Sequence, residues 1–230
     1  MELTAEGFEA ALWALQSDQE RVKIAKHRRG GASGVIGVRM KSIFDTAAVY
    51  ADMPLDEVER LLESEYYDSR LGAVSVLDFK ARRRGITDEE RRELCELYLR
   101  RHDRIDDWGL VDRAAPRVVG WYLLDKPRDP LFALARSSVV WERRSAITAA
   151  FWFIRQGDVD DALAIAALLL GDADELVLKS VGTGLREVGV VDQDRLVAFL
   201  REHGEAVPRV TLRIAVAKLP SELRAELMAR

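Results

Sequence analysis

Cysteine, histidine and membrane-length apolar segments are scarce in this sequence, and each scarcity excludes a class of protein. A single cysteine, Cys95, cannot form a disulfide framework, and its apolar neighbours predict a buried thiol. The three histidines are far apart in the chain, so we expect no metal site and no cofactor. No apolar run approaches the length of a membrane span, and the acidic, amphipathic N-terminus is unlike a signal peptide. We therefore expect a cytoplasmic protein with no membrane partner.

A net positive charge is also missing. The 35 Lys and Arg residues face 39 Asp and Glu residues, which gives a formal net charge of -4. The whole chain therefore exerts no general attraction on nucleic acid, and any such partner has to be held by a local patch of basic residues.

The alternation of apolar and polar residues that is typical of strands is absent, and helical periodicity runs along the whole chain. Residues suited to N-caps precede acid-rich first turns at Thr4, Ser17 and Thr87. Prolines stand where new helices would begin, at Pro54, Pro127 and Pro130. These features predict an all-α protein of about a dozen helices joined by short turns.

The segment HRRGGASGVIGVRMK, residues 27 to 41, is rich in glycine and basic residues. It lacks the GxxxxGK[ST] pattern of a nucleotide-binding loop, and no strand precedes it, so no nucleotide cofactor is expected. Two interpretations stay open. The segment is a flexible connector, or its backbone contacts a nucleic-acid phosphate with support from Arg28, Arg29 and Arg39.

A repeated motif begins with a basic residue and continues with small or apolar ones. Its members start at Arg70, Arg144, Lys179 and Arg213, and the last three are 35 and 34 positions apart. The 74 positions from Arg70 to Arg144 make about two such units. This spacing is close to that of HEAT-type repeats and predicts an α-solenoid of stacked antiparallel helix pairs, forming one domain over residues 1–230.

Residues at equivalent positions of such a stack line up along one surface. In one interpretation each arginine pairs with an acid on the neighbouring helix. In the other, the four basic residues form a concave basic groove for an anionic rod, and duplex DNA is the obvious candidate.

The slot midway between Arg70 and Arg144 falls on the sequence VDRAAP, where it is filled by Asp112 or Arg113. Trp108 lies one helical turn before Asp112, on adjoining surface. Pro116 cannot donate a hydrogen bond to the carbonyl of Asp112, so the helix is expected to kink or restart there. The alternative is an ordinary apolar stripe that includes Trp108, with Asp112 paired to Arg113 or Arg104.

Five segments together resemble the AlkD-like DNA alkylation-repair glycosylases, which are built of HEAT-like repeats. They are GVIGVRM, RRHDRIDDWGLVDRAAPRVVG, VVWERRSAITAAFWFIRQG, LVLKSVGTGLREVG and PRVTLRIAVAKLP, and the likeness spans nearly the whole chain. The W-x-x-x-D pattern matches Trp108 and Asp112, and the later W-x-x-R pattern ends at Arg144. The resemblance implies an enzyme that removes N3- and N7-alkylated purines from double-stranded DNA, with Trp108, Asp112 and Arg144 in the catalytic site. We expect the protein to be a monomer. The resemblance further implies that the damaged nucleotide need not be flipped into a pocket, unlike in most glycosylases.

These residue types suit that chemistry. An N3- or N7-alkylated purine is cationic and already a good leaving group, so the enzyme mainly has to stabilise the cationic sugar. Asp112 would do so and position a water, Trp108 would offer its π face, and Arg144 would hold the adjacent phosphate. Further DNA contacts are expected from five basic residues and one threonine, at Arg39, Arg70, Arg113, Lys179, Thr183 and Arg213.

The sequence departs from the family pattern at two positions. Thr183 stands where relatives carry a second tryptophan, and His27 stands near the position of another aromatic residue. We interpret Thr183, flanked by Gly182 and Gly184, as opening the cleft for a bulkier adduct, or as a sign of weak activity on small lesions.

The runner-up function is a non-catalytic helical-repeat module that binds DNA or a protein. For the glycosylase, we expect no cleavage of the DNA backbone, although Lys179 or Lys23 stays open as a Schiff-base nucleophile. A bacterial, nucleoid-associated location is expected when the protein is bound to DNA.

Overall fold

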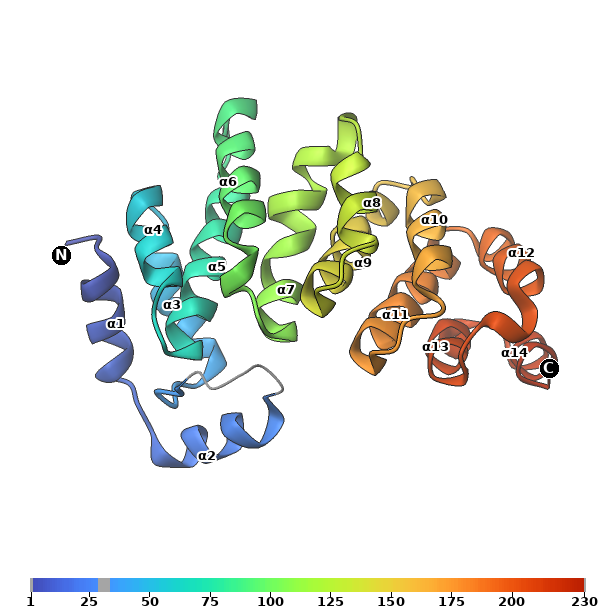
Figure 1. Cartoon of the computed structure of the whole chain (residues 1–230), viewed down its shortest axis with the longest axis horizontal. Coiled ribbons are helices and arrows are strands. Elements are labelled where there is room, and N and C mark those ends of the chain that lie inside the picture. Colours follow the sequence, from blue (N-terminus) through green and yellow to red (C-terminus); the bar gives the residue numbers. More distant parts are fainter. Residues whose placement is uncertain (1, 29–33, 230) are drawn as a thin grey trace. The chain divides into compact units, whose positions relative to one another are not determined.

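The computed structural model describes residues 2–28 and 34–229, and their regular structure is helical. Fourteen α-helices and several 3-10 or π segments account for it, with one isolated bridge between Gly34 and Tyr66 (Figure 1). The predicted all-α helical-repeat class is thus confirmed. No helix in these two ranges is long and apolar enough to cross a membrane.

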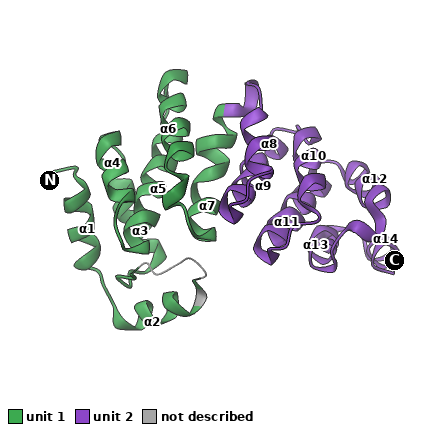
Figure 2. Cartoon of the chain, viewed as in Figure 1, with its two compact units in different colours: residues 1–122 green, residues 123–230 purple. Residues whose placement is uncertain are grey.

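The chain consists of two compact units, residues 1–122 and 123–230 (Figure 2). The first contains α1 (Ala5–Trp13), α2 (Asp18–His27), α3 (Met40–Val49), α4 (Leu55–Leu62), α5 (Tyr67–Ala81), α6 (Asp88–Arg100) and α7 (Trp108–Ala114), followed by the π-helical segment Ala115–Gly120. The second contains α8 (Asp129–Ala135), α9 (Val140–Arg155), α10 (Asp160–Leu169), α11 (Glu175–Val191), α12 (Gln193–His203), α13 (Arg209–Ala215) and α14 (Ser221–Met228). A single domain over residues 1–230 stays a prediction, as does a basic groove along the chain.

Capping residues explain several helix starts. The Thr4 side chain accepts a hydrogen bond from the Gly7 N–H, and Thr87 forms a capping box with Glu90. Ser17 holds the N-cap position of α2, but its side chain makes no capping hydrogen bond. Pro54 is the N-cap of α4 and Pro130 lies in the first turn of α8, whereas Pro127 precedes that helix.

One helix in each unit forms the centre of the core. Helix α5 is buried almost throughout, from Tyr67 to Asp78, between α3, α4 and α7. Helix α9 is buried from Arg144 to Ala150 and packs against α8, α10 and α11. Because each central helix contacts partners on several sides, burial extends around the helix and is not confined to one stripe.

The described part of the glycine-rich segment is fixed by a buried carboxylate. Asp68 on α5 accepts hydrogen bonds from the backbone N–H groups of Ile36 (2.9 Å), Gly37 (3.3 Å) and Val38 (2.8 Å). Gly37 has a φ of +95°, which a side chain would strain. A flexible connector is therefore the wrong interpretation for residues 34–38, while Arg29 lies outside the described residues.

A buried arginine links neighbouring helix pairs in unit 1. Arg70 is only 2% exposed, and its guanidinium donates to the Ser64 carbonyl (3.0 Å) and to the Asp106 carboxylate (2.8 Å). Its carboxylate partner lies 36 residues further along the chain, in the next helix pair. Arg70 therefore pairs with an acid of the neighbouring repeat, and the expected place in a surface track of charge is wrong for this residue.

The same arrangement recurs in unit 2 at Arg143. This side chain donates to the Ser137 carbonyl (3.0 Å) and to the Asp172 carboxylate (3.0 Å), which lies 29 residues later. Like Arg70, it bonds the carbonyl six residues before it and an acid of the next helix pair. The structural counterpart of Arg70 is thus Arg143, one residue before the position that the sequence repeat indicated.

Candidate functional site on helix α7

Helix α7 begins at a buried N-cap. Asp107 is 1% exposed, and its carboxylate accepts a hydrogen bond from the Gly109 N–H (3.0 Å). Gly109 leaves room for the Tyr67 hydroxyl, since a Cβ at this position would lie 2.5 Å from that oxygen. The start of α7 is therefore fixed by the Asp107 side chain at its N-cap and by Tyr67 of α5.

Arg28, at the C-terminal end of α2, joins this cluster. Its guanidinium lies over the Tyr67 ring, 4.8 Å from the ring centre, and its Nε is 3.9 Å from the Asp107 carboxylate. Burial and the nearby Asp107 charge raise the pKa of Tyr67 far above its usual range, so this phenol stays neutral. The cluster links the end of α2 to the start of α7.

Trp108 and Asp112 lie one turn apart on α7, as predicted. Trp108 is half-buried and Asp112 is exposed, while Val111 and Ala114 are buried. The carboxylate therefore lies on the exposed side of the helix. Arg104, one of the partners considered for it, donates instead to the Leu62, Glu63 and Ser64 carbonyls.

The expected distortion at Pro116 is confirmed. The α-helical pattern ends at Ala114, and a π-helical segment runs from Ala115 to Gly120 with the Trp121 N–H bonded to the Pro116 carbonyl (3.0 Å). Proline has no N–H to continue the α-helical ladder, so the chain changes to the wider turn. Such segments are often found at functional sites.

The side chain of Arg113 contacts buried residues inside unit 1. It pairs with the buried Asp78 carboxylate (3.0 Å) and donates to the Ser75 hydroxyl (3.1 Å). Its guanidinium also lies over the rings of Phe44 (4.2 Å) and Phe79 (5.0 Å). The choice left open between Asp112 and Arg113 is resolved in favour of Asp112 as the exposed residue, and the expected DNA contact of Arg113 does not fit this position.

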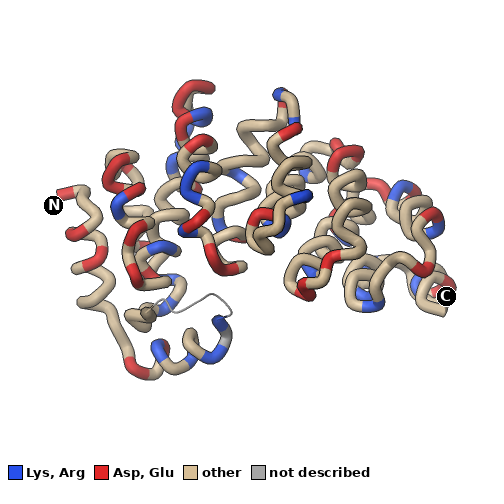
Figure 3. Tube along the Cα trace, viewed as in Figure 1, with Lys and Arg blue, Asp and Glu red and all other residues tan. Residues whose placement is uncertain are grey.

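Arg39 is exposed at the start of α3, and it lines a pocket of about 310 Å³ together with Trp108. Unit 1 therefore holds three of the predicted site residues, Arg39, Trp108 and Asp112, in positions open to solvent. Lys and Arg residues are numerous along α2 of this unit (Figure 3).

The other predicted site residues belong to unit 2. Arg144 on α9 is 7% exposed and donates to the Leu176 carbonyl of α11. Lys179 on α11 is exposed and pairs with Glu175 (2.7 Å), and Arg213 on α13 is exposed. Helix α11 packs against both α9 and α13, so these residues lie on three helices that are joined through α11.

Thr183 is half-buried on α11 and donates to the Lys179 carbonyl (3.0 Å). Its neighbours Gly182 and Gly184 are buried, and a Cβ on Gly182 would lie 2.8 Å from the Thr211 carbonyl of α13. These glycines serve the close approach of helices, and the interpretation that Thr183 opens the cleft for a bulkier adduct stays a prediction. The side chain of His27, the other departure, lies outside what the structure describes.

Sequence reasoning missed the residues that hold α7 in place. Asp107 carried a usable signal, because an aspartate directly before a helical run is a typical N-cap. Tyr67 and Arg28 carried none, since their contacts join residues about forty or more positions apart in the chain. Among the described residues, no group of three acidic, cysteine or histidine side chains is placed to hold a metal ion.

The structure defines a helical-repeat protein with a tryptophan and an aspartate on a helix that ends in a π segment. The chain belongs to the DNA alkylation repair enzyme family, whose family model matches residues 8–219. No curated protein matches the chain. Membership assigns it a role in the repair of alkylated DNA, as the sequence resemblance implied.

Proposed function

We propose that this chain is a monofunctional DNA glycosylase that hydrolyses the N-glycosidic bond of N3- and N7-alkylated purines in duplex DNA, without a cofactor. The observation that carries the proposal is the geometry of α7. Trp108 and Asp112 lie one turn apart on a helix fixed by a buried cap, and Asp112 is exposed among buried neighbours. Family membership supports the same substrate class.

The reaction needs a negatively charged carboxylate and does not need a side chain that donates a proton to the base. Alkylation at N3 or N7 makes the purine cationic, so the base leaves without prior protonation. Positive charge then develops on the deoxyribose, and the Asp112 carboxylate stabilises it and positions the attacking water. The new bond forms between the water oxygen and the anomeric carbon. The electron pair of the breaking bond stays on the purine nitrogen, so the base leaves uncharged, and the proton of the water passes to solvent.

Two further residues are assigned roles in the proposed reaction, Trp108 of unit 1 and Arg144 of unit 2. The indole offers its π face to the developing sugar cation and keeps bulk water away. Arg144 holds the adjacent phosphate. Its planar guanidinium suits a phosphate, because it can donate two parallel hydrogen bonds.

Four exposed or half-buried residues are proposed to contact the DNA around the lesion, namely Arg39, Lys179, Thr183 and Arg213. Arg70 and Arg113 are not among them, because their side chains are engaged inside unit 1. Steep weakening of binding with salt would support phosphate contacts, since each neutralised phosphate contributes about -0.9 to the log-log slope.

Product analysis tests the proposal. The protein is incubated with a duplex that carries N7-methylguanine, and both the free base and the state of the strand are measured. We expect free N7-methylguanine and an abasic site in an intact strand. DNA binding with no base release would favour the non-catalytic module, and strand cleavage would indicate a lysine nucleophile instead of water.

A further inference from the structure

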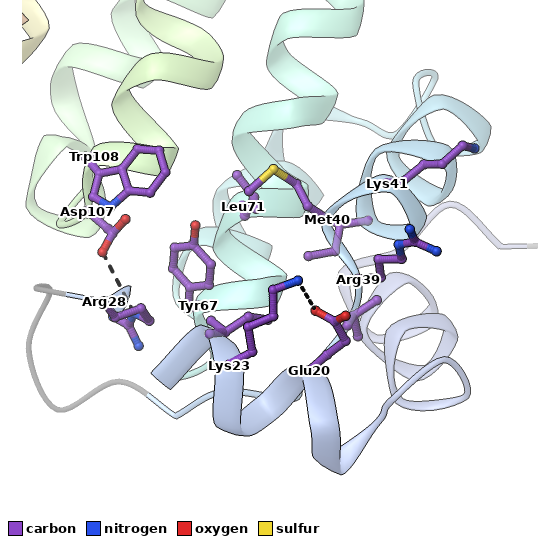
Figure 4. A pocket seen from close by; sticks show the side chains of 13 residues that line it. Glu20, Lys23, Arg28, Arg39, Met40, Lys41, Tyr67, Leu71, Asp107 and Trp108 are labelled. Atoms are coloured by element: carbon purple, nitrogen blue, oxygen red, sulfur yellow. Dashed lines mark ion pairs between the residues drawn. The ribbon is translucent and has the colours of Figure 1, made fainter. Parts of the chain in front are cut away.

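Unit 1 contains a pocket of about 310 Å³ to which the proposed reaction assigns no occupant. It lies between α2, α3, α5 and the start of α7 (Figure 4). Its volume falls at the lower end of the ~300–1,000 Å³ that is usual for small-ligand sites. The pocket shares Trp108 with the proposed catalytic site, whereas Asp112 does not line it.

The two ends of the pocket differ in chemistry. At one end, Trp108 and Tyr67 provide flat aromatic walls, and Asp107 and Arg28 provide polar groups (Figure 4). Between the ends, the lining is aliphatic, with Leu71 and other apolar side chains. A planar ring with a polar edge suits such surroundings, because its faces contact apolar walls while its edge meets hydrogen-bonding groups.

The other end of the pocket is cationic. Arg39 lies there at the start of α3, next to Lys41, whose ammonium pairs with Asp45 (2.6 Å), and Lys23 of α2 pairs with Glu20 (3.5 Å) (Figure 4). Four of the lining side chains are basic and two are acidic, although the whole chain carries a net charge of -4. The first turn of α3 has no acidic residue and no side-chain cap, so the helix end adds to the positive potential.

We propose that this pocket binds one unpaired nucleotide of the DNA strand. The base lies against Trp108 and Tyr67, and the phosphate lies at Arg39. The inference rests on the proposed function, because it takes DNA as the partner. It extends that function, because it provides a site for a second nucleotide besides the one that is cleaved.

Position identifies which nucleotide fits. The proposed reaction places the cleaved sugar at Asp112, and Asp112 does not line the pocket. The phosphate of a different nucleotide is attracted by Arg39. The occupant is therefore an unmodified nucleotide that has lost its pairing partner near the lesion, and the alkylated base itself stays outside.

The test compares two duplexes that differ only in one unpaired deoxyadenosine nucleotide. Affinity is measured by fluorescence anisotropy, with the label at a distant end. We expect the wild-type protein to prefer the duplex with the unpaired nucleotide by about tenfold, in the range that stacking of one base on aromatic side chains provides.

Met40→Trp fills the pocket from its mouth. Met40 lines the pocket and is 46% exposed, so the larger side chain does not disturb the core. The matched control is Val49→Trp, on the same helix, because Val49 is 60% exposed and does not line the pocket. The preference should disappear in Met40→Trp and persist in Val49→Trp, while both variants bind the fully paired duplex like the wild type.

The remaining outcomes separate this inference from the proposed function. A wild-type protein that releases alkylated bases but shows no preference for the unpaired nucleotide would overturn the inference alone. A preference that survives Met40→Trp would overturn it too. Binding of free deoxyadenosine monophosphate that is sensitive to Met40→Trp, without any preference among duplexes, would assign the pocket to a free nucleotide. Failure to bind DNA at all would overturn both.

Discussion

Replacing Gly109 by alanine tests how the start of α7 positions Trp108 and Asp112. The new Cβ would lie 2.5 Å from the Tyr67 hydroxyl oxygen, whereas ordinary contact begins at 3.4 Å. The next nearest atoms, on Asp107 and in the Tyr67 ring, are at 3.5 and 3.6 Å and need not move. The clash is therefore with a single oxygen atom.

The magnitude follows from two opposing effects. Overpacking of this kind costs about 1–3 kcal/mol, and alanine regains roughly 0.5–1 kcal/mol over glycine within a helix. We expect Gly109→Ala to lower the free energy of unfolding by about 1–2 kcal/mol. Displacement of α7 by up to about 1 Å would also reduce base release by as much as about 100-fold, because Trp108 and Asp112 move with it.

Tyr67→Phe removes the oxygen atom that causes the clash. In that background, Gly109→Ala should be neutral or slightly stabilising, which gives a favourable coupling of about 1–2 kcal/mol between the two substitutions. Urea unfolding followed by circular dichroism measures the four free energies, and single-turnover base release measures the four rates. Equal effects of Gly109→Ala in both backgrounds would refute the proposed packing of Tyr67 against α7.

Three further predictions concern other parts of the molecule. Arg70→Met should leave duplex affinity within about twofold of the wild type, whereas Arg213→Ala should weaken binding and reduce the log-log salt slope by about 0.9, both read from salt titrations. Cys95 is buried, and burial raises the pKa of its thiol to about 12, so iodoacetamide should modify it at pH 8 only after unfolding, as mass spectrometry would record. Burial raises the pKa of Asp172, but the hydrogen bonds from Arg143 lower it by more, so the pKa of Asp172 is lowered in the folded protein. The stability that Asp172 contributes should be present above the unfolded pKa of about 3.9 and disappear as the pH falls through the lower folded value, and Asp172→Asn should abolish this dependence in urea unfolding.

Local rules predicted much of the helical architecture. Thr4 and Thr87 were recognisable as caps from the acidic residues that follow them, and Pro116 was recognisable as a helix distortion from its missing N–H. These features depend on residues within one or two turns of each other, so the sequence displays them directly.

Long-range contacts were not predictable in this way. The repeated basic residue suggested a surface track, but Arg70 is buried against Asp106, 36 residues away. Asp68 is likewise explained only by the backbone N–H groups of residues about thirty positions earlier. Periodicity indicates which face of a helix is polar, but it does not indicate whether a polar side chain meets water or a buried partner.

The candidate site also combines a local feature that the sequence predicted with long-range contacts that it did not. The sequence correctly placed Trp108 and Asp112 on adjoining surface, because one helical turn fixes their spacing. The cluster of Arg28, Tyr67 and Asp107 that holds their helix joins α2, α5 and α7, and no local pattern connects these segments. The contacts among these three residues could be identified only from the three-dimensional structure.

The central claim is that the Asp112 carboxylate lowers the barrier to breaking the bond between sugar and base. Single-turnover release of N7-methylguanine from a duplex, measured for the wild type, for Asp112→Asn and for the control Asp56→Asn, an exposed aspartate of α4, tests it most directly. We predict a loss of at least about 100-fold for Asp112→Asn with duplex affinity retained, and no change for Asp56→Asn. Equal release by all three proteins would contradict the account.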